Sequence, residues 1–390
     1  MARNFSVRSG EFTKAINVAN SVDSEFITLT FSPASELLKI DARSDTSGVY
    51  LDCELNVHDF DDDFLQWSFA AKSFVGWLNN VNRGKSVNFE IKDNNLRVYT
   101  ARASMSLRNR SINNYAARLK FNSESAGVLR SELISSTFKP AASLATANKK
   151  YKDSKASSSP LQFIGMVLKG SRLKLLASDG GAALITNVPC VVNKEVRLFP
   201  SPHSVGPLAR YIAKDFDSVE IHVQSNLIFF KFSDVVFYFV NNDAAESFPV
   251  DQMIGFIERE RNNELVLSQD NFIGSLSAVQ GMAQAENLQY PRVDMSIGLD
   301  TDADGDLQKV LNVAAVSKES GNAEQSLAIT GNGDIGATVS ASVKYLKLAA
   351  QVVNQEKIRI SWGKLVDWIL IDTSLSDEVK LVVAPIIPQN

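Results

Sequence analysis

Apolar and polar residues follow two different periods along this chain, and the two patterns succeed each other in a regular order. Near the N-terminus, Phe12, Ala15, Ile16 and Ala19 recur at the three- and four-residue spacing of one helix face. Segments that alternate with a period of two come next, as is typical of half-buried strands, and a second helical pattern covers residues 70–81. The pattern predicts helices that alternate with groups of strands.

This order of helix and strand patterns returns twice more. A Val-x-x-Leu pair marks the second helical pattern of each copy, and the three pairs are Val75 with Leu78, Val205 with Leu208, and Val343 with Leu346. Their spacing of roughly 130–140 residues is far longer than a solenoid repeat and indicates a repeated domain. We therefore expect an α+β fold of three copies, over residues 1–122, 123–258 and 259–390, with the helices on one side of the sheets.

Residues 173–189 predict a β-hairpin. Leu173, Leu175 and Ala177 alternate with less apolar neighbours, and residues 182–188 are apolar enough to return as the second strand. Between them, Asp179-Gly180-Gly181 predicts a tight turn, because glycine adopts positive φ without steric cost. A surface hairpin of this kind occurs in many β proteins, so the pattern alone does not indicate a function.

The composition is that of an ordinary globular protein, with 45% hydrophobic and 22% charged residues. No apolar run reaches the roughly 18 residues of a membrane span, and residues 1–5 lack the apolar region of a secretory signal. Only Cys53 and Cys190 are present, which is too few for a disulfide framework or a zinc site. We expect a protein of a reducing cytoplasm, without a membrane partner.

Two acidic segments are candidate metal sites. Residues 300–306 resemble the start of an EF-hand loop with Gly305 at the turn, but Leu311 stands where the bidentate glutamate would be, which favours a solvated hairpin tip. Residues 59–63 lie beside His58 between strand and helix patterns, where a charged loop is common. His222 alternates within a strand pattern and is interpreted as a strand-face residue. No nucleophile, phosphate-loop or dinucleotide motif occurs, so we expect no catalytic residue, no enzyme activity, no cofactor and no metal.

Positive charge gathers on the helical segments although the net charge is −4. Residues 70–85 carry three basic residues and no acidic one, and residues 130–155 and 344–357 are also net basic. A solvated helix face has the same appearance. The alternative is a protein that presents its positive charge to nucleic acid on one surface.

Three short motifs resemble those of the bacterial replicative sliding clamp, the beta subunit of DNA polymerase III. They are Ser178-Asp-Gly180, Phe248-Pro249 and Val382-Val-Ala-Pro385. The resemblance covers nearly the whole chain and implies a homodimer that closes head to tail into a ring of six domains, with helices lining the hole and sheets outside. It implies a processivity factor without chemistry of its own, which encircles double-stranded DNA independently of sequence and tethers the replicative DNA polymerase.

Three sets of site residues are predicted, the first from the placement of positive charge along the chain and the other two from the resemblance. The DNA-binding set is basic: Lys72, Arg83, Lys85, Lys149, Lys150, Lys152, Lys155, Lys344 and Lys347. The dimer-interface set is apolar: Met105, Leu107 and Met282. The third set would form a groove for short linear motifs of the polymerase and the clamp loader: Phe163, Ser178, Gly180, Gly181, Ala182, Ala183, Pro249, Met253, Ile254, Val382, Val383, Ala384, Pro385 and Ile386.

The sequence departs from the family at several of these positions. The family has His-Arg after its Asp-Gly turn, where this chain has Gly181-Ala182, and it has methionines where this chain has Ala384 and Ile386. These changes predict a wider, less polar groove, and such divergence suits a phage-encoded clamp. Two other functions stay open at this point. One is a repeat-built structural protein such as a virion component, and the other is a metal-dependent enzyme that uses residues 59–63 or 300–306.

Overall fold

The computed structural model divides the chain into two compact units. One comprises Met1–Lys139, Leu168–Ser171 and Pro189–Asp243, and the other Pro140–Val167, Arg172–Val188 and Ala244–Asn390. The described residues are 3–22, 24–57, 65–81, 84–92, 95–110, 123–146, 160–210, 218–233, 235–242, 247–285, 291–301, 305–353, 355–363, 368–373 and 379–386. The domain boundaries at residues 122 and 258 stay a prediction, because the two units follow a different division.

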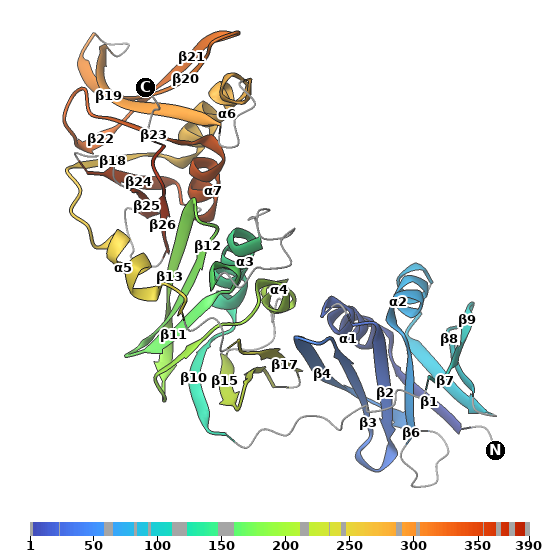
Figure 1. Ribbon diagram of the computed structural model, residues 1–390. Helices are drawn as coiled ribbons and strands as arrows, with labels where there is room; N and C mark the ends of the chain where they lie inside the picture. Colours follow the sequence, from blue (N-terminus) through green and yellow to red (C-terminus); the bar gives the residue numbers. More distant parts are fainter. Residues whose placement is uncertain are drawn as a thin grey trace. The chain divides into compact units, whose positions relative to one another are not determined.

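One unit of a strand, a helix and three more strands is repeated along the chain (Figure 1). The first two repeats are β1 (Arg3–Arg8), α1 (Ser9–Ser21), β2 (Phe26–Ser32), β3 (Leu37–Arg43) and β4 (Ser47–Glu54), then β6 (Leu65–Ala70), α2 (Ala71–Asn80), β7 (Ser86–Lys92), β8 (Asn95–Tyr99) and β9 (Ser104–Arg108). The short strand β5 (Asn56–Val57) lies between them.

The next two repeats have the same order of elements. They are β10 (Ser125–Arg130), α3 (Glu132–Thr146), β11 (Gly165–Lys169), β12 (Arg172–Ser178) and β13 (Ala182–Val192), then β14 (Val196–Leu198), α4 (Pro202–Arg210), β15 (Ser218–Gln224), β16 (Leu227–Lys231) and β17 (Val235–Val240). The helix α3 runs through Pro140.

The last two repeats follow the additional helix α5 (Val250–Ile257). They are β18 (Asn263–Ser268), α6 (Gln269–Gln284), β19 (Arg292–Thr301), β20 (Leu307–Ser317) and β21 (Gly321–Ala328), then β23 (Thr338–Ser342), α7 (Val343–Val353), β24 (Lys357–Trp362), β25 (Ile369–Thr373) and β26 (Val379–Val383). The short strand β22 (Thr330–Asn332) pairs with β18. The predicted α+β fold of repeated helix-and-sheet copies is confirmed.

Antiparallel pairs between last strands join the first repeat to the fourth and the third to the sixth. β17 pairs with β4, from Val235 opposite Leu51 to Phe239 opposite Ser47. β13 pairs with β26, from Ala182 opposite Val383 to Thr186 opposite Val379. Among the described strands, the last strands β9 and β21 lie at edges, of the sheet β5-β1-β7-β8-β9 and of the sheet β21-β20-β19-β23. The first pair lies within one compact unit and the second pair within the other.

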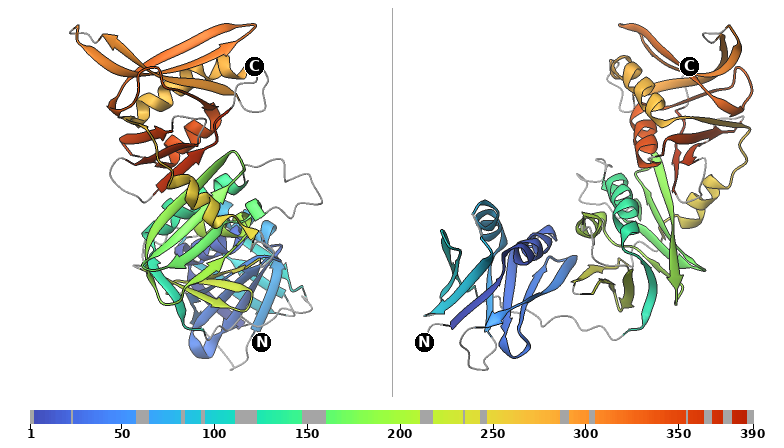
Figure 2. Two further views of the ribbon diagram at one scale, coloured as in Figure 1. Left: turned by 60° about the vertical axis from the view of Figure 1, so that its left-hand side comes forward. Right: turned by 180° about the vertical axis from the view of Figure 1, so that it is seen from behind.

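Helices pack on the sheets through the apolar faces that the sequence pattern predicts. α1 lies beside α2, and α6 beside α7 (Figure 2). In the first repeats, Phe12 meets Phe74 and Phe89 edge to face, with ring centroids 6.1 and 5.3 Å apart. Both members of all three Val-x-x-Leu pairs are buried. Burial of each such side chain contributes about 1.5–3 kcal/mol, so these faces hold the helices on their sheets.

Candidate functional site

The hairpin predicted around Asp179 is confirmed by β12 and β13. Its turn is fixed by side chains, because Oδ1 of Asp179 accepts hydrogen bonds from the backbone N–H groups of Gly181 and Ala182, each at 3.0 Å. The hydroxyl of Ser178 donates to the carbonyl of Ala182 at 2.8 Å. Gly180 has a φ of 89°, a conformation that favours glycine. This turn therefore needs the residue types that the sequence supplies.

The C-terminal strand lies directly against this hairpin. Ala182 and Ala183 of β13 pair with Val383 and Val382 of β26. The pairing continues into the turn, since the N–H of Ala384 donates to the carbonyl of Gly181 at 2.9 Å. The hairpin and residues 382–384, which are 200 positions apart in the chain, are thus brought together within one compact unit.

Helix α5 brings a third part of the predicted groove to the same unit. Its first turn is formed by a hydrogen bond of 2.9 Å from the N–H of Met253 to the carbonyl of Pro249. Residues of α5 contact residues of β26. Phe163 is the first of the predicted groove residues in chain order. It follows a single 3₁₀ turn over Pro160–Gln162 and is half-buried.

The predicted groove residues differ in how much surface they offer. Six of them are buried and therefore support the predicted groove from beneath: Ser178, Ala182, Ala183, Met253, Val382 and Val383. Those with surface to offer a ligand are Phe163, Gly180, Gly181, Pro249, Ile254, Ala384, Pro385 and Ile386. All eight are apolar or lack a side chain, and all but Gly180 are half-buried, which suits a ligand with apolar anchors.

Tyr345 of α7 completes the hairpin, and sequence reasoning missed it. Its hydroxyl donates to Oδ2 of Asp179 at 2.6 Å, and only 5% of the residue is exposed. A Cβ added to Gly181 would lie 2.5 Å from Cε2 of Tyr345, so the ring occupies the space that a side chain at position 181 would need. Asp179 therefore uses both carboxylate oxygens, one for the turn and one for the helix.

The predicted DNA-binding residues fall partly outside the described residues, namely Arg83, Lys149, Lys150, Lys152 and Lys155. Lys72 of α2, Lys85 before β7 and Lys344 of α7 are exposed. Lys347, one turn further along α7, is half-buried and donates from Nζ to Oε1 of Gln280 at 2.8 Å. The three exposed lysines have the solvent access that phosphate contacts need.

The predicted interface residues lie on β9 and α6. Met105 is half-buried on the edge strand β9. Leu107, on the same strand, is buried, and its carbonyl accepts a hydrogen bond of 3.1 Å from the indole N–H of Trp67. Met282 of α6 is half-buried. Leu107 thus packs within its own chain, while Met105 and Met282 have surface to offer a partner.

The candidate metal segments contain no assembled site within the described part of the chain. Asp300 and Asp306 flank the tip of the β19–β20 hairpin, as the hairpin interpretation predicts, and residues 302–304 lie outside the described residues. His58 and residues 59–63 are likewise outside them. No group of three or more His, Cys, Asp or Glu residues could hold an ion among the residues described.

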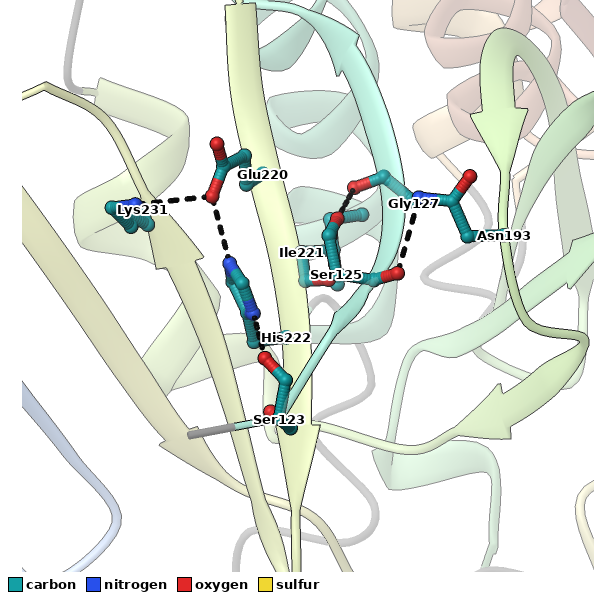
Figure 3. Close-up of polar contacts among 8 residues, drawn as sticks. All are labelled: Ser123, Ser125, Gly127, Asn193, Glu220, Ile221, His222 and Lys231. Atoms are coloured by element: carbon teal, nitrogen blue, oxygen red, sulfur yellow. Dashed lines mark hydrogen bonds and ion pairs between the residues drawn. The ribbon is translucent and has the colours of Figure 1, made fainter. Parts of the chain in front are cut away.

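His222 lies on the face of β15, as predicted, within a polar network (Figure 3). Its Nδ1 is 2.9 Å from the carbonyl of Ser123, and its Nε2 is 2.9 Å from Oε2 of Glu220. Lys231 donates to the same carboxylate oxygen at 3.2 Å. The hydrogen bonds from His222 and Lys231 lower the pKa of Glu220. Both ring nitrogens of His222 thus meet a protein partner, which indicates a structural role in the sheet.

No family model matches this chain, and no curated protein matches it by sequence. Solved structures match over its whole length. The DNA polymerase sliding clamp from Bacillus subtilis has a TM-score of 0.82 at 12% identity and covers 100% of both chains. The beta subunit from Thermotoga maritima has 0.83 at 13%, covering 99% of this chain and 100% of that one, and the Pseudomonas aeruginosa clamp bound to griselimycin has 0.81 at 13%, covering 100% of both.

The described chain contains no helix that is long and apolar enough to cross a membrane. The order of its repeats and the match over full length lead to one conclusion about architecture. This chain has the fold of the bacterial DNA polymerase III beta subunits, the sliding clamps.

Proposed function

We propose that this chain is a DNA sliding clamp, a non-enzymatic processivity factor that encircles duplex DNA. The observation that carries the proposal is the likeness to sliding clamps over the full length of both chains. A phage-encoded clamp that works in a bacterial cytoplasm suits its 12% identity to the Bacillus subtilis protein. The division into three domains at residues 122 and 258 is part of the proposal.

The strand edges support ring closure by a homodimer. Each repeat ends in a strand, and four of these last strands already pair within the chain, β4 with β17 and β13 with β26. The two that remain, β9 and β21, lie at sheet edges among the described strands. A pair between β9 of one protomer and β21 of another would satisfy both edges, and two such pairs would close a head-to-tail dimer. Met105 on β9 and Met282 on α6 would lie at this interface.

The basic residues support contact with DNA that does not depend on the base sequence. In the proposed ring, contacts from helices go to phosphates, which carry no sequence information. Three exposed lysines, Lys72, Lys85 and Lys344, are available for such contacts in the described structure. The complete proposed set also contains Arg83, Lys149, Lys150, Lys152, Lys155 and Lys347. Binding of this kind weakens as salt rises. Because phosphate contacts are the same at every position along the DNA, the ring would slide rather than stay at one place.

A retention experiment tests the proposal. The protein is loaded on nicked circular plasmid at low salt, the salt is raised, and the complex is separated by gel filtration. We expect protein to stay with circular DNA and to leave when the plasmid is linearised. Met105→Glu should lose retention, because a charge on the edge strand opposes dimer closure.

The control for retention is Lys39→Glu, which changes a residue of β3, a strand of another sheet than β9 and β21, and should leave retention intact. Equal loss from circular and linear DNA by the parent protein would contradict the clamp and favour a repeat-built structural protein. Turnover that depends on added metal would favour an enzyme.

The partner groove has its own test. We propose that the half-buried apolar positions around the hairpin and C-terminal strand bind a short motif with leucine or phenylalanine anchors, as found on a polymerase or clamp loader. Ile386→Asp should weaken binding of such a peptide at least about tenfold, because the carboxylate would replace an apolar contact at a half-buried position. Calorimetry measures the affinity, and the thermal midpoint checks that the fold persists.

The matched control is Ile335→Asp, which makes the same change at an exposed isoleucine in the turn after β22. Peptide affinity should stay at the parental value in this variant. Unchanged affinity in Ile386→Asp as well would place the partner site elsewhere on the chain.

A further inference from the structure

The last residues of the predicted groove, positions 384–386, are fixed by backbone hydrogen bonds to two different elements. We call them the C-terminal groove segment. The N–H of Ala384 donates to the carbonyl of Gly181 at 2.9 Å, which ties one end of the segment to the turn between β12 and β13. The N–H of Ile386 donates to the carbonyl of Ser340 at 2.8 Å, which ties the other end to β23.

Both attachments lead to the beginning of α7. Ser340 lies on β23, the strand that runs directly into this helix. Gly181 belongs to the turn in which Oδ2 of Asp179 accepts a hydrogen bond from the hydroxyl of Tyr345, a residue of the first turn of α7. α7 also contacts β26, the strand that continues into the C-terminal groove segment (Figure 1). The beginning of α7 is therefore a common support for both ends of this segment.

The contact between Tyr345 and the turn leaves little room for movement. Both Tyr345 and Asp179 are buried, and a hydrogen bond to a charged acceptor is strong when water is kept away from it. The ring of Tyr345 fills the space beside Gly181, so the turn packs directly against the helix. The other carboxylate oxygen of Asp179 holds the backbone N–H groups of Gly181 and Ala182. One carboxylate thus shapes the turn and attaches it to α7.

We propose that Tyr345 is a positioning residue for the predicted groove: through Asp179 and the carbonyl of Gly181, it holds the C-terminal groove segment in the arrangement that binds a partner peptide. This inference rests on the proposed function of the groove. Tyr345 is buried, so it acts through its neighbours. Without its hydroxyl, the turn and the segment would adopt other arrangements as well. The apparent dissociation constant of the peptide would then rise by the inverse of the fraction that stays competent to bind.

Peptide affinity of the intact protein tests this role. The probe is a short fluorescent peptide with leucine and phenylalanine anchors among serines, and binding is measured where every variant is folded. Tyr345→Phe should bind the peptide at least about threefold more weakly than the parent. Asp179→Asn should bind nearly like the parent, because its amide oxygen accepts the two turn N–H groups and its amide nitrogen donates to the hydroxyl of Tyr345. Asp179→Ala, which loses all of these bonds, should bind at least as weakly as Tyr345→Phe.

The control for a general loss of stability is Val279→Ala. Val279 is a buried residue of α6 in the same compact unit and lies outside the chain of hydrogen bonds from Tyr345 to Ala384. Its truncation removes apolar contacts from the core and should lower the thermal midpoint. Peptide affinity should nevertheless stay at the parental value, because the support of the C-terminal groove segment is intact.

Three results would count against the positioning role, and they have different meanings. Parental affinity in Tyr345→Phe would overturn it and leave the proposed groove in place. An equal loss of affinity in Val279→Ala and Tyr345→Phe would also overturn it, because lower stability would then explain both. A parent protein that does not bind the peptide would contradict the proposed groove itself, and the positioning role with it.

Discussion

Replacing Arg359 with methionine is expected to lower the free energy of unfolding by about 3–5 kcal/mol, because the variant leaves a buried carboxylate without its cation. Asp372 is fully buried, and the guanidinium of Arg359 meets both of its oxygens, Nε to Oδ1 and Nη2 to Oδ2, each at 2.8 Å. The hydrogen bonds to Asp372 raise the pKa of Arg359. Urea unfolding followed by circular dichroism measures the loss.

Two further variants separate this pair from ordinary surface charge. Glu264 also approaches Arg359, at 3.5 Å, but its side chain is 53% exposed. Glu264→Gln should therefore change the free energy of unfolding by less than about 1 kcal/mol. The double variant Arg359→Met/Asp372→Leu should recover much of the lost stability, since it removes both charges from the interior. An Arg359→Met protein as stable as the parent would contradict the expectation.

Tyr345→Phe is expected to lower the free energy of unfolding by about 1.5–3 kcal/mol, the usual contribution of a hydrogen bond to a charged group. The variant keeps the ring over Gly181 and removes only the hydroxyl that binds Oδ2 of Asp179. The turn bonds to Oδ1 remain, so the hairpin should persist while its attachment to α7 weakens. Hydrogen exchange at residues 179–184 and 345–350 should rise together.

Tyr99→Phe is the matched control for this prediction. Tyr99 of β8 is half-buried and belongs to the other compact unit, so the exchange of residues 179–184 should stay at the parental rate. If Tyr345→Phe keeps the parental free energy of unfolding, solvent replaces the hydroxyl as the partner of Asp179 without loss of stability, which would contradict the prediction.

Local patterns predicted the elements well, because a buried face imposes its period on the sequence. The Val-x-x-Leu pairs are buried in all three copies, and the Asp-Gly-Gly turn forms the predicted hairpin. His222 alternates within a strand, and the structure places it on the face of β15. Each of these predictions depends on neighbours within one or two elements.

Contacts between distant segments could not be predicted in the same way. Tyr345 and Asp179 are 166 positions apart, and Tyr345 also fits the pattern of a buried helix face. Gly181 was interpreted as widening the groove, whereas the ring of Tyr345 fills the space beside it. Leu107 was expected at an interface from its position in the resemblance, and in the single chain it is buried. Periodicity shows that a side chain is buried and does not show which partner it meets.

Two strand pairs lie within the chain, β4 with β17 and β13 with β26. They affect how the proposed dimeric ring would respond to dilution. Two partners on one chain meet at an effective concentration set by the linker, which the amount of protein in solution does not change. A contact between β9 and β21 of separate chains would have no such linker. Dilution would therefore open the proposed ring at these two places and leave the other four strand pairs closed. The points where DNA could enter would thus be decided by chain connectivity, even if all six strand pairs were equally strong.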